Sequence, residues 1–194
     1  FFAAIPYTMS TVYGFTIEQS GLVFLSVAVG CALGLVTVIV CDVKYYKPQV
    51  ANFPVGKVPP EFRLYSAIIG SFGLPIGLFW FAWTAKANIS WASPVVAIVM
   101  YQWGNLCVFI STAQYLADTY TGSVVASASG ACTLSRYAFG GIFPLFIIQM
   151  FKAMGVDWAV SLFGFVTIAL VPIPWVLFKY GPTIRARSKY DTIQ

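Results

Sequence analysis

The sequence predicts an all-α protein that spans a lipid bilayer, and composition and hydropathy pattern both support this prediction. Hydrophobic residues make up 59% of the 194 residues, whereas charged residues make up only 9%. Soluble domains carry about 25% charged residues, so this chain lacks the charge that a water-exposed surface needs. Because about 20 apolar helical residues cross the hydrocarbon core, each long uncharged stretch is a candidate membrane-spanning helix.

Five such stretches follow one another along the chain. Helices are expected at residues 22–41, 64–85, 91–117, 123–151 and 158–178, and residues 1–9 are expected to be the end of a further helix. Residues 42–63 contain four prolines and are expected to form a loop, because proline interrupts a helix. Residues 179–194 are expected to form a tail.

Basic residues in short loops mark the cytoplasmic side of a membrane protein. The loop at 42–63 and the tail hold most of them, namely Lys44, Lys47, Lys57, Arg63, Lys179, Arg185, Arg187 and Lys189. Four crossings separate these two segments, so both are predicted on the cytoplasmic side. The plasma membrane is expected ahead of the vacuolar membrane.

The sequence lacks the residues that several classes of function require. The chain has no histidine, and its four cysteines show no CxxC spacing, so no metal, cofactor or disulfide is expected. No catalytic triad or P-loop pattern is present, so an enzyme is not expected. The net charge is +5, but the basic residues lie in loops that flank the membrane. This distribution does not indicate a nucleic-acid partner.

Two predicted helices carry polar faces. At spacings of four and three residues, one face of the 91–117 helix collects Tyr101, Asn105, Val108, Thr112 and Tyr115. This face either hydrogen-bonds to a neighbouring helix or lines a wet cavity, and we expect the cavity, with Tyr101, Asn105, Thr112 and Tyr115 as contacts for a substrate.

The 123–151 helix carries the second polar face, formed by Ser129, Thr133, Arg136 and Gly140. A guanidinium at this depth costs at least about 2.5 to 3.5 kcal/mol, so Arg136 should face the bundle interior. It either forms a fixed ion pair, for which Asp118 is the nearest acidic residue in sequence, or acts on a substrate or a gate. Ser129, Thr133 and Arg136 are therefore further cavity candidates.

Charged residues also lie at the membrane ends of the 42–63 loop and near the end of the 91–117 helix. Asp42, Glu61, Arg63 and Asp118 are candidates for a gate at this end. The alternative is an interfacial set of charges that anchors the helix ends.

Several short strings follow one another along the chain, namely PEFRL at 60–64, LPIGLFWFAWT at 74–84, YLADTY at 115–120, Arg136 with Phe139 and Gly140, FPLF at 143–146, KYGP at 179–182 and IRARSK at 184–189. In this order they resemble strings of fungal major facilitator superfamily (MFS) multidrug and polyamine transporters of the drug:proton antiporter group.

The resemblance implies the C-terminal six-helix half of a twelve-helix MFS bundle, with the six predicted segments as helices 7 to 12. The other half of the same protein, the bilayer, a small-molecule substrate and protons are the implied partners. The implied function is proton-coupled export of drugs, polyamines or other amphipathic organic cations by alternating access. Two alternatives stay open, namely a facilitator without proton coupling and a membrane scaffold or receptor that does not transport.

Overall fold

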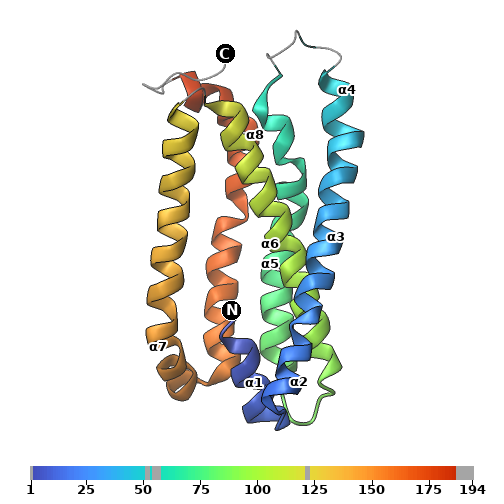
Figure 1. The fold of residues 1–194 in the computed structure, drawn as a ribbon, viewed down its shortest axis with the longest axis vertical. Coiled ribbons are helices and arrows are strands. Elements are labelled where there is room, and N and C mark those ends of the chain that lie inside the picture. Colours follow the sequence, from blue (N-terminus) through green and yellow to red (C-terminus); the bar gives the residue numbers. More distant parts are fainter. Residues whose placement is uncertain (1, 51–52, 54–57, 121–122, 187–194) are drawn as a thin grey trace.

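The computed structural model describes residues 2–50, 53, 58–120 and 123–186, and these residues form a bundle of long helices that run side by side (Figure 1). The elements, in order, are α1 (Ala4–Tyr13), α2 (Ile17–Val23), α3 (Leu25–Cys41), η1 (Asp42–Tyr46), α4 (Lys47–Val50), η2 (Pro60–Leu64), α5 (Tyr65–Thr84), α6 (Ala92–Thr119), α7 (Ser123–Leu170) and α8 (Pro172–Ala186). Of the basic residues used to predict orientation, Lys57, Arg187 and Lys189 lie outside the described residues.

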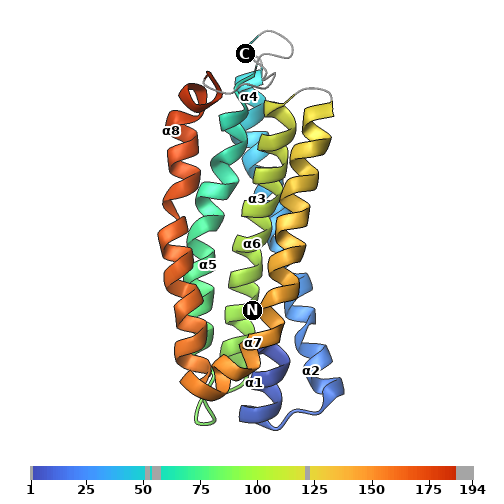
Figure 2. The same cartoon turned by 90° about the vertical axis from the view of Figure 1, so that its left-hand side faces the viewer.

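Helix α7 is too long to cross a bilayer once. Together with α8 it forms one apolar helical region that runs from Val124 to Ala186, a length of 63 residues. A straight helix of this length would extend roughly 95 Å. At Gly155 the backbone has φ 79° and ψ 159°, a conformation that side-chain-bearing residues rarely adopt. The chain reverses there, so α7 has a first limb (residues 123–154) and an antiparallel second limb (residues 156–170) that leads into α8 (Figures 1 and 2).

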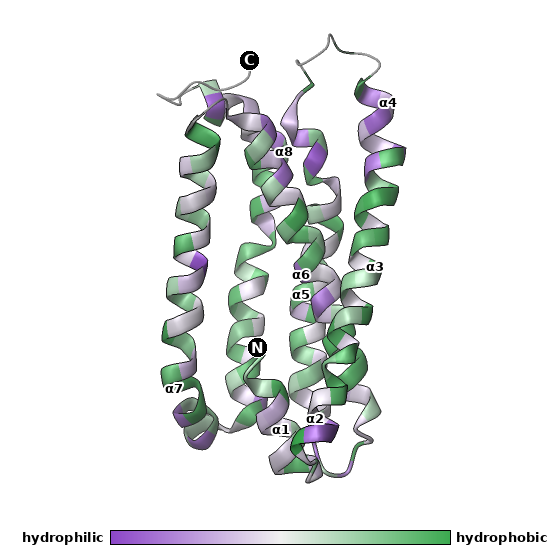
Figure 3. Cartoon of the chain, viewed as in Figure 1, coloured by the Kyte–Doolittle hydropathy of each residue, from purple (hydrophilic) through white to green (hydrophobic). Residues whose placement is uncertain are grey.

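The described residues thus contain four apolar helical regions of membrane-spanning length, the last of which folds back on itself. Large apolar side chains lie exposed along α3, α5, α7 and α8, and Figure 3 shows hydrophobic residues along the full length of the outer helices. A surface of this kind suits lipid rather than water.

The N-terminal helices differ from the expected ranges. Helix α1 ends at Tyr13 rather than at residue 9, because Gly14 adopts a left-handed conformation with φ 65°. Thr16 then caps α2, its side chain accepting a hydrogen bond from the Gln19 backbone N–H while the Gln19 side chain accepts one from the Thr16 N–H. This capping box places the next helix start at Ile17, five residues before the expected position.

The expected loop at residues 42–63 is partly helical. The chain continues from α3 through a π-helical turn, η1, into α4, and a 3₁₀ turn, η2, precedes α5. Pro48 lies in the first turn of α4, where a missing N–H is tolerated. Helix α4 and the C-terminal end of α8 lie at the same end of the bundle (Figure 1), and we call this the η2 end.

Helix α6 packs closely against both α3 and α5. A Cβ atom at Gly77 would lie 2.6 Å from the Tyr101 backbone nitrogen, and one at Gly104 would lie 2.5 Å from the Gly70 carbonyl oxygen. A Cβ at Gly30 would lie 2.7 Å from the Val99 carbonyl oxygen. Small residues let membrane helices approach this closely, so α3, α5 and α6 form a tightly packed unit.

Candidate functional site

The first limb of α7 leaves its polar face open. Ser129, Thr133 and Arg136 are all exposed, and a Cβ at Gly140 would meet nothing within 4 Å. The Arg136 guanidinium carbon lies 4.3 Å from the centre of the Phe109 ring on α6. Within the described part of the chain Arg136 forms no ion pair, so the pairing with Asp118 that was one of the alternatives for it is not the arrangement found.

The face predicted on α6 divides into two environments. Tyr101 is half-buried and packs against the apolar core, with its backbone over Gly77. Asn105 and Tyr115 are also half-buried, whereas Thr112 is exposed and donates a hydrogen bond of 2.7 Å to the Val108 carbonyl. Tyr101 therefore packs within the bundle, whereas the part of this face near Thr112 is accessible.

Polar residues off that face join α6 to α3. The side chain of Gln102 is only 6% exposed, and its amide nitrogen donates to the Cys31 sulfur at 3.2 Å. Trp103 Nε1 donates to Thr37 Oγ1 at 2.9 Å. These hydrogen bonds between helices involve residues outside the predicted face, and they help to hold α3 and α6 together.

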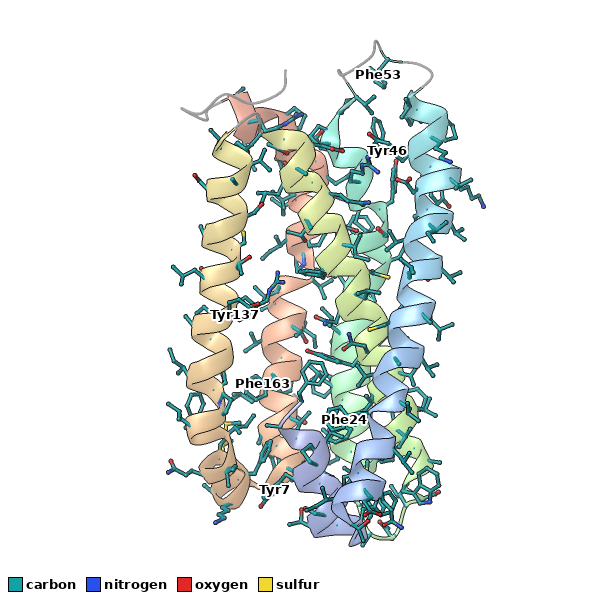
Figure 4. The ribbon with its side chains drawn as sticks, in the orientation of Figure 1. Tyr7, Phe24, Tyr46, Phe53, Tyr137 and Phe163 are labelled. Carbon is teal, nitrogen blue, oxygen red and sulfur yellow. The ribbon has the colours of Figure 1, made fainter. Side chains whose placement is uncertain are left out.

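Three of the four predicted gate residues meet at the η2 end. Arg63 of η2 lies between two carboxylates, with Nη1 2.7 Å from Asp42 Oδ1 and Nε 2.8 Å from Asp118 Oδ2. The guanidinium carbon also lies 3.6 Å from the centre of the Tyr46 ring, at the η2 end of the bundle (Figure 4). The cluster joins η1, η2 and the end of α6, and it explains why Asp118 is not free to pair with Arg136.

Glu61, the fourth predicted gate residue, lies outside this cluster. Its side chain is 6% exposed, and Oε1 lies 2.8 Å from Nη2 of Arg185 on α8. A Cβ at Gly181 would lie 2.5 Å from the same oxygen, so α8 packs directly against the carboxylate. Arg185 was expected only as a tail residue, because the sequence alone does not show that α8 continues past residue 178.

An aromatic cavity lies between α1 and the two limbs of α7, and it was not predicted. It has a volume of about 340 Å³ and is lined by Phe2, Ala3, Phe139, Gly140, Phe143, Pro144, Ile147 and Phe163. Phe143 on the first limb and Phe163 on the second meet edge to face at 5.6 Å. Phe163 is labelled in Figure 4. The spacing of Arg136, Gly140, Phe143 and Ile147 could have revealed this stripe, but only its polar members were considered.

Within the described ranges there is no group of three or more His, Cys, Asp or Glu side chains that could hold a metal ion.

Comparison with known proteins finds relatives among fungal MFS transporters. The citrinin biosynthesis cluster MFS transporter mrr1 of Monascus ruber is 40% identical over 98% of this chain, and the efflux pump FUB11 of Gibberella fujikuroi is 38% identical over 97%. This chain is homologous to fungal MFS transporters over nearly its whole length. Polyamine transporter 4 of Saccharomyces cerevisiae is a further relative, 34% identical over 98% of the chain.

The chain spans about a third of the length of these MFS transporters, with 38%, 32% and 33% of the three relatives covered. No family model and no solved structure matches it. The apolar helices and the MFS relatives identify an integral membrane protein, and the relatives are named as transporters rather than enzymes.

Proposed function

We propose that this chain is the C-terminal half of an MFS secondary transporter that exports small amphipathic organic molecules by alternating access. The observation that carries the proposal is similarity over 97 to 98% of the chain to proteins named as MFS transporters and efflux pumps. The open polar face of α7 and the accessible part of the α6 face support it, because polar groups within a bilayer segment belong at a partner or at a water-filled pathway.

In this proposal, α6 contributes hydrogen bonds to the substrate from Asn105, Thr112 and Tyr115. The first limb of α7 contributes the polar groups of Ser129, Thr133 and Arg136. Tyr101 contributes its ring edge from the apolar core. Asp42, Glu61, Arg63 and Asp118 belong to charge clusters at the η2 end, which suits residues that hold helix ends together in one transport state. The resemblance to drug and polyamine transporters adds to the proposal that drugs or polyamines are exported and that export is coupled to protons. Both properties require the remaining part of the protein.

Thiol accessibility in the full-length protein tests the pathway directly. The native cysteines Cys31, Cys41, Cys107 and Cys132 are free, so they are first replaced by serine or alanine. Single cysteines at Asn105 and Thr112 should then react with a charged, water-soluble thiol reagent, and substrate should protect them. Cysteine at Val36, an exposed apolar position of α3, is the control and should stay unreactive because it faces lipid.

Efflux assays on the same variants distinguish the alternatives. Inaccessible thiols at 105 and 112 in every state, together with no efflux of any compound in a drug and cation panel, would favour the scaffold or receptor. Accessible thiols with efflux that does not respond to a pH gradient would favour a facilitator without proton coupling.

A further inference from the structure

Arg136 and the aromatic cavity lie on one stripe of the first limb of α7. Residues 136, 140, 143 and 147 follow one another at spacings of four, three and four, which stacks them on one helix face. Gly140, Phe143 and Ile147 line the cavity of about 340 Å³, and Arg136 lies one turn beyond its end. The stripe therefore places Arg136 one helical turn from an aromatic pocket, with its guanidinium beside Phe109 of α6.

The dimensions suit a small organic molecule. Small-molecule pockets start at roughly 300 Å³, so this cavity can hold a body of one or two fused rings. Seven helical residues separate Arg136 from Phe143, and a rise of 1.5 Å per residue puts their Cα atoms roughly 10 Å apart along the axis. A ring held in the cavity against Phe143 and Phe163 could thus present a polar substituent towards Arg136.

The guanidinium is oriented but retains hydrogen-bonding capacity. Its carbon lies 4.3 Å from the centre of the Phe109 ring, a cation–π contact that holds the group beside α6. A contact with a ring face uses none of the five N–H donors of a guanidinium, which therefore stay available for a carboxylate or similar anion. Among the described residues no carboxylate pairs with it.

Among the described residues, the carboxylates of α6 and α7 are both held by basic side chains and offer no partner to a cationic ligand on this stripe. The acid of α6, Asp118, is held by Arg63 at 2.8 Å, and the acid of α7, Asp157, lies 3.6 Å from Lys86 near the Gly155 reversal. The charge offered to a ligand on this face is therefore positive. This is the sign opposite to the one that an organic cation would need.

We propose that Arg136, with Phe139, Phe143 and Phe163, forms a subsite for amphipathic molecules that carry an aromatic ring and an anionic group such as a carboxylate. This inference rests on the proposed function in one respect only, that a transported molecule reaches this face of α7. The ring occupies the cavity, and the anion accepts hydrogen bonds from the Arg136 guanidinium.

Equilibrium binding to the purified full-length protein tests the subsite without requiring transport. Three probes share one ring system and differ in charge, namely 2-naphthoate, 2-naphthol and 2-naphthylmethylamine. We expect 2-naphthoate to bind best. Arg136→Gln should weaken 2-naphthoate binding about tenfold or more, as expected for loss of a charged hydrogen bond, and should change 2-naphthol binding less than about twofold.

Matched variants separate charge, ring contact and folding. Arg136→Lys should retain most of the preference for 2-naphthoate, whereas Phe143→Ala should weaken 2-naphthoate and 2-naphthol alike. Tyr137→Phe is the control, because Tyr137, labelled in Figure 4, is 74% exposed and lies about 100° round the helix from Arg136. Each variant is compared only if it elutes as wild type in gel filtration.

Three results would overturn the subsite: tighter binding of 2-naphthylmethylamine than of 2-naphthoate, equal losses for all three probes in Arg136→Gln, or no binding of 2-naphthoate at millimolar concentration. A protein that binds 2-naphthoate through Arg136 but exports nothing would instead contradict the proposed function and leave the subsite intact.

Discussion

Glu61 and Arg63 lie two residues apart on the single turn of η2, but their side chains form ion pairs with different elements of the bundle. Glu61 pairs with Arg185 of α8, whereas Arg63 pairs with Asp42 of η1 and Asp118 of α6. A five-residue element therefore ties together three other elements at one end of the bundle. The two clusters differ in burial, and this difference leads to different expected effects of substitution.

The Glu61–Arg185 pair is the more buried of the two clusters. Its side chains are 6% and 15% exposed, and removing one partner of a buried pair leaves an uncompensated charge. We expect Glu61→Ala to destabilise the protein by roughly 3 kcal/mol, measured as a loss of thermal stability in detergent. The double variant Glu61→Ala with Arg185→Leu should regain part of that loss, since no unpaired charge remains.

Glu18→Ala is the control for this experiment, because Glu18 is an exposed carboxylate in α2, away from the η2 end. If Glu61→Ala and Glu18→Ala lower the melting temperature equally, the pair does not hold α8 in place.

Arg63 serves two carboxylates that solvent partly reaches, so its contribution per pair is smaller. Exposed ion pairs contribute about 0.2 to 1 kcal/mol each, and the side chains of Asp42 and Asp118 are 32% and 33% exposed. We expect Arg63→Gln to lower stability by more than a single pair would, since it also leaves two like charges facing one another. Arg63→Lys should recover only part of this, because a lysine cannot match the forked geometry of the guanidinium.

A double-mutant cycle measures this arrangement. Arg63→Gln combined with Asp118→Asn should be less destabilising than the sum of the two single variants, by thermal unfolding in detergent. Strict additivity would show that the 2.8 Å contact contributes nothing to stability.

The sequence predicted the all-α membrane fold well because hydropathy alone determines which segments can lie in lipid. It predicted element ends poorly. The capping box at Thr16 and Gln19 and the reversal at Gly155 depend on local backbone geometry, which hydropathy does not record. The expected segments at 123–151 and 158–178 nevertheless lie on opposite sides of that reversal.

For the candidate site, periodicity located polar residues but not their partners. It placed Arg136 on a helix face, yet the nearest acid in sequence, Asp118, lies with Arg63. The aromatic surface that Arg136 meets comes from Phe109 on another helix. Contacts of this kind depend on helix rotation and on close approach at glycines, and neither can be read from one sequence.

The contact between Arg136 and Phe109 gives a third prediction. Exposed cation–π contacts contribute about 0.5 to 1 kcal/mol, so Phe109→Leu should lower thermal stability only slightly. Its effect should instead appear in efflux by the full-length protein, because the guanidinium loses the surface that orients it. Arg136→Ala should reduce efflux with surface expression retained.

The two variants should not be additive in efflux, because Phe109 acts through Arg136. Undiminished efflux in Arg136→Ala would remove this residue from the mechanism, whatever the effect of Phe109→Leu.

Close packing of α5 on α6 gives the last prediction, in which one substitution is compared at two glycines. A Cβ at Gly77 would lie 2.6 Å from the Tyr101 backbone nitrogen, whereas a Cβ at Gly130 would meet nothing within 4 Å. Gly77→Ala should therefore push α5 and α6 apart and lower the melting temperature in detergent. Gly130→Ala should be neutral or stabilise by up to about 1 kcal/mol, since alanine favours a helix over glycine. Equal effects at the two positions would show that the α5–α6 interface is looser than the structure has it.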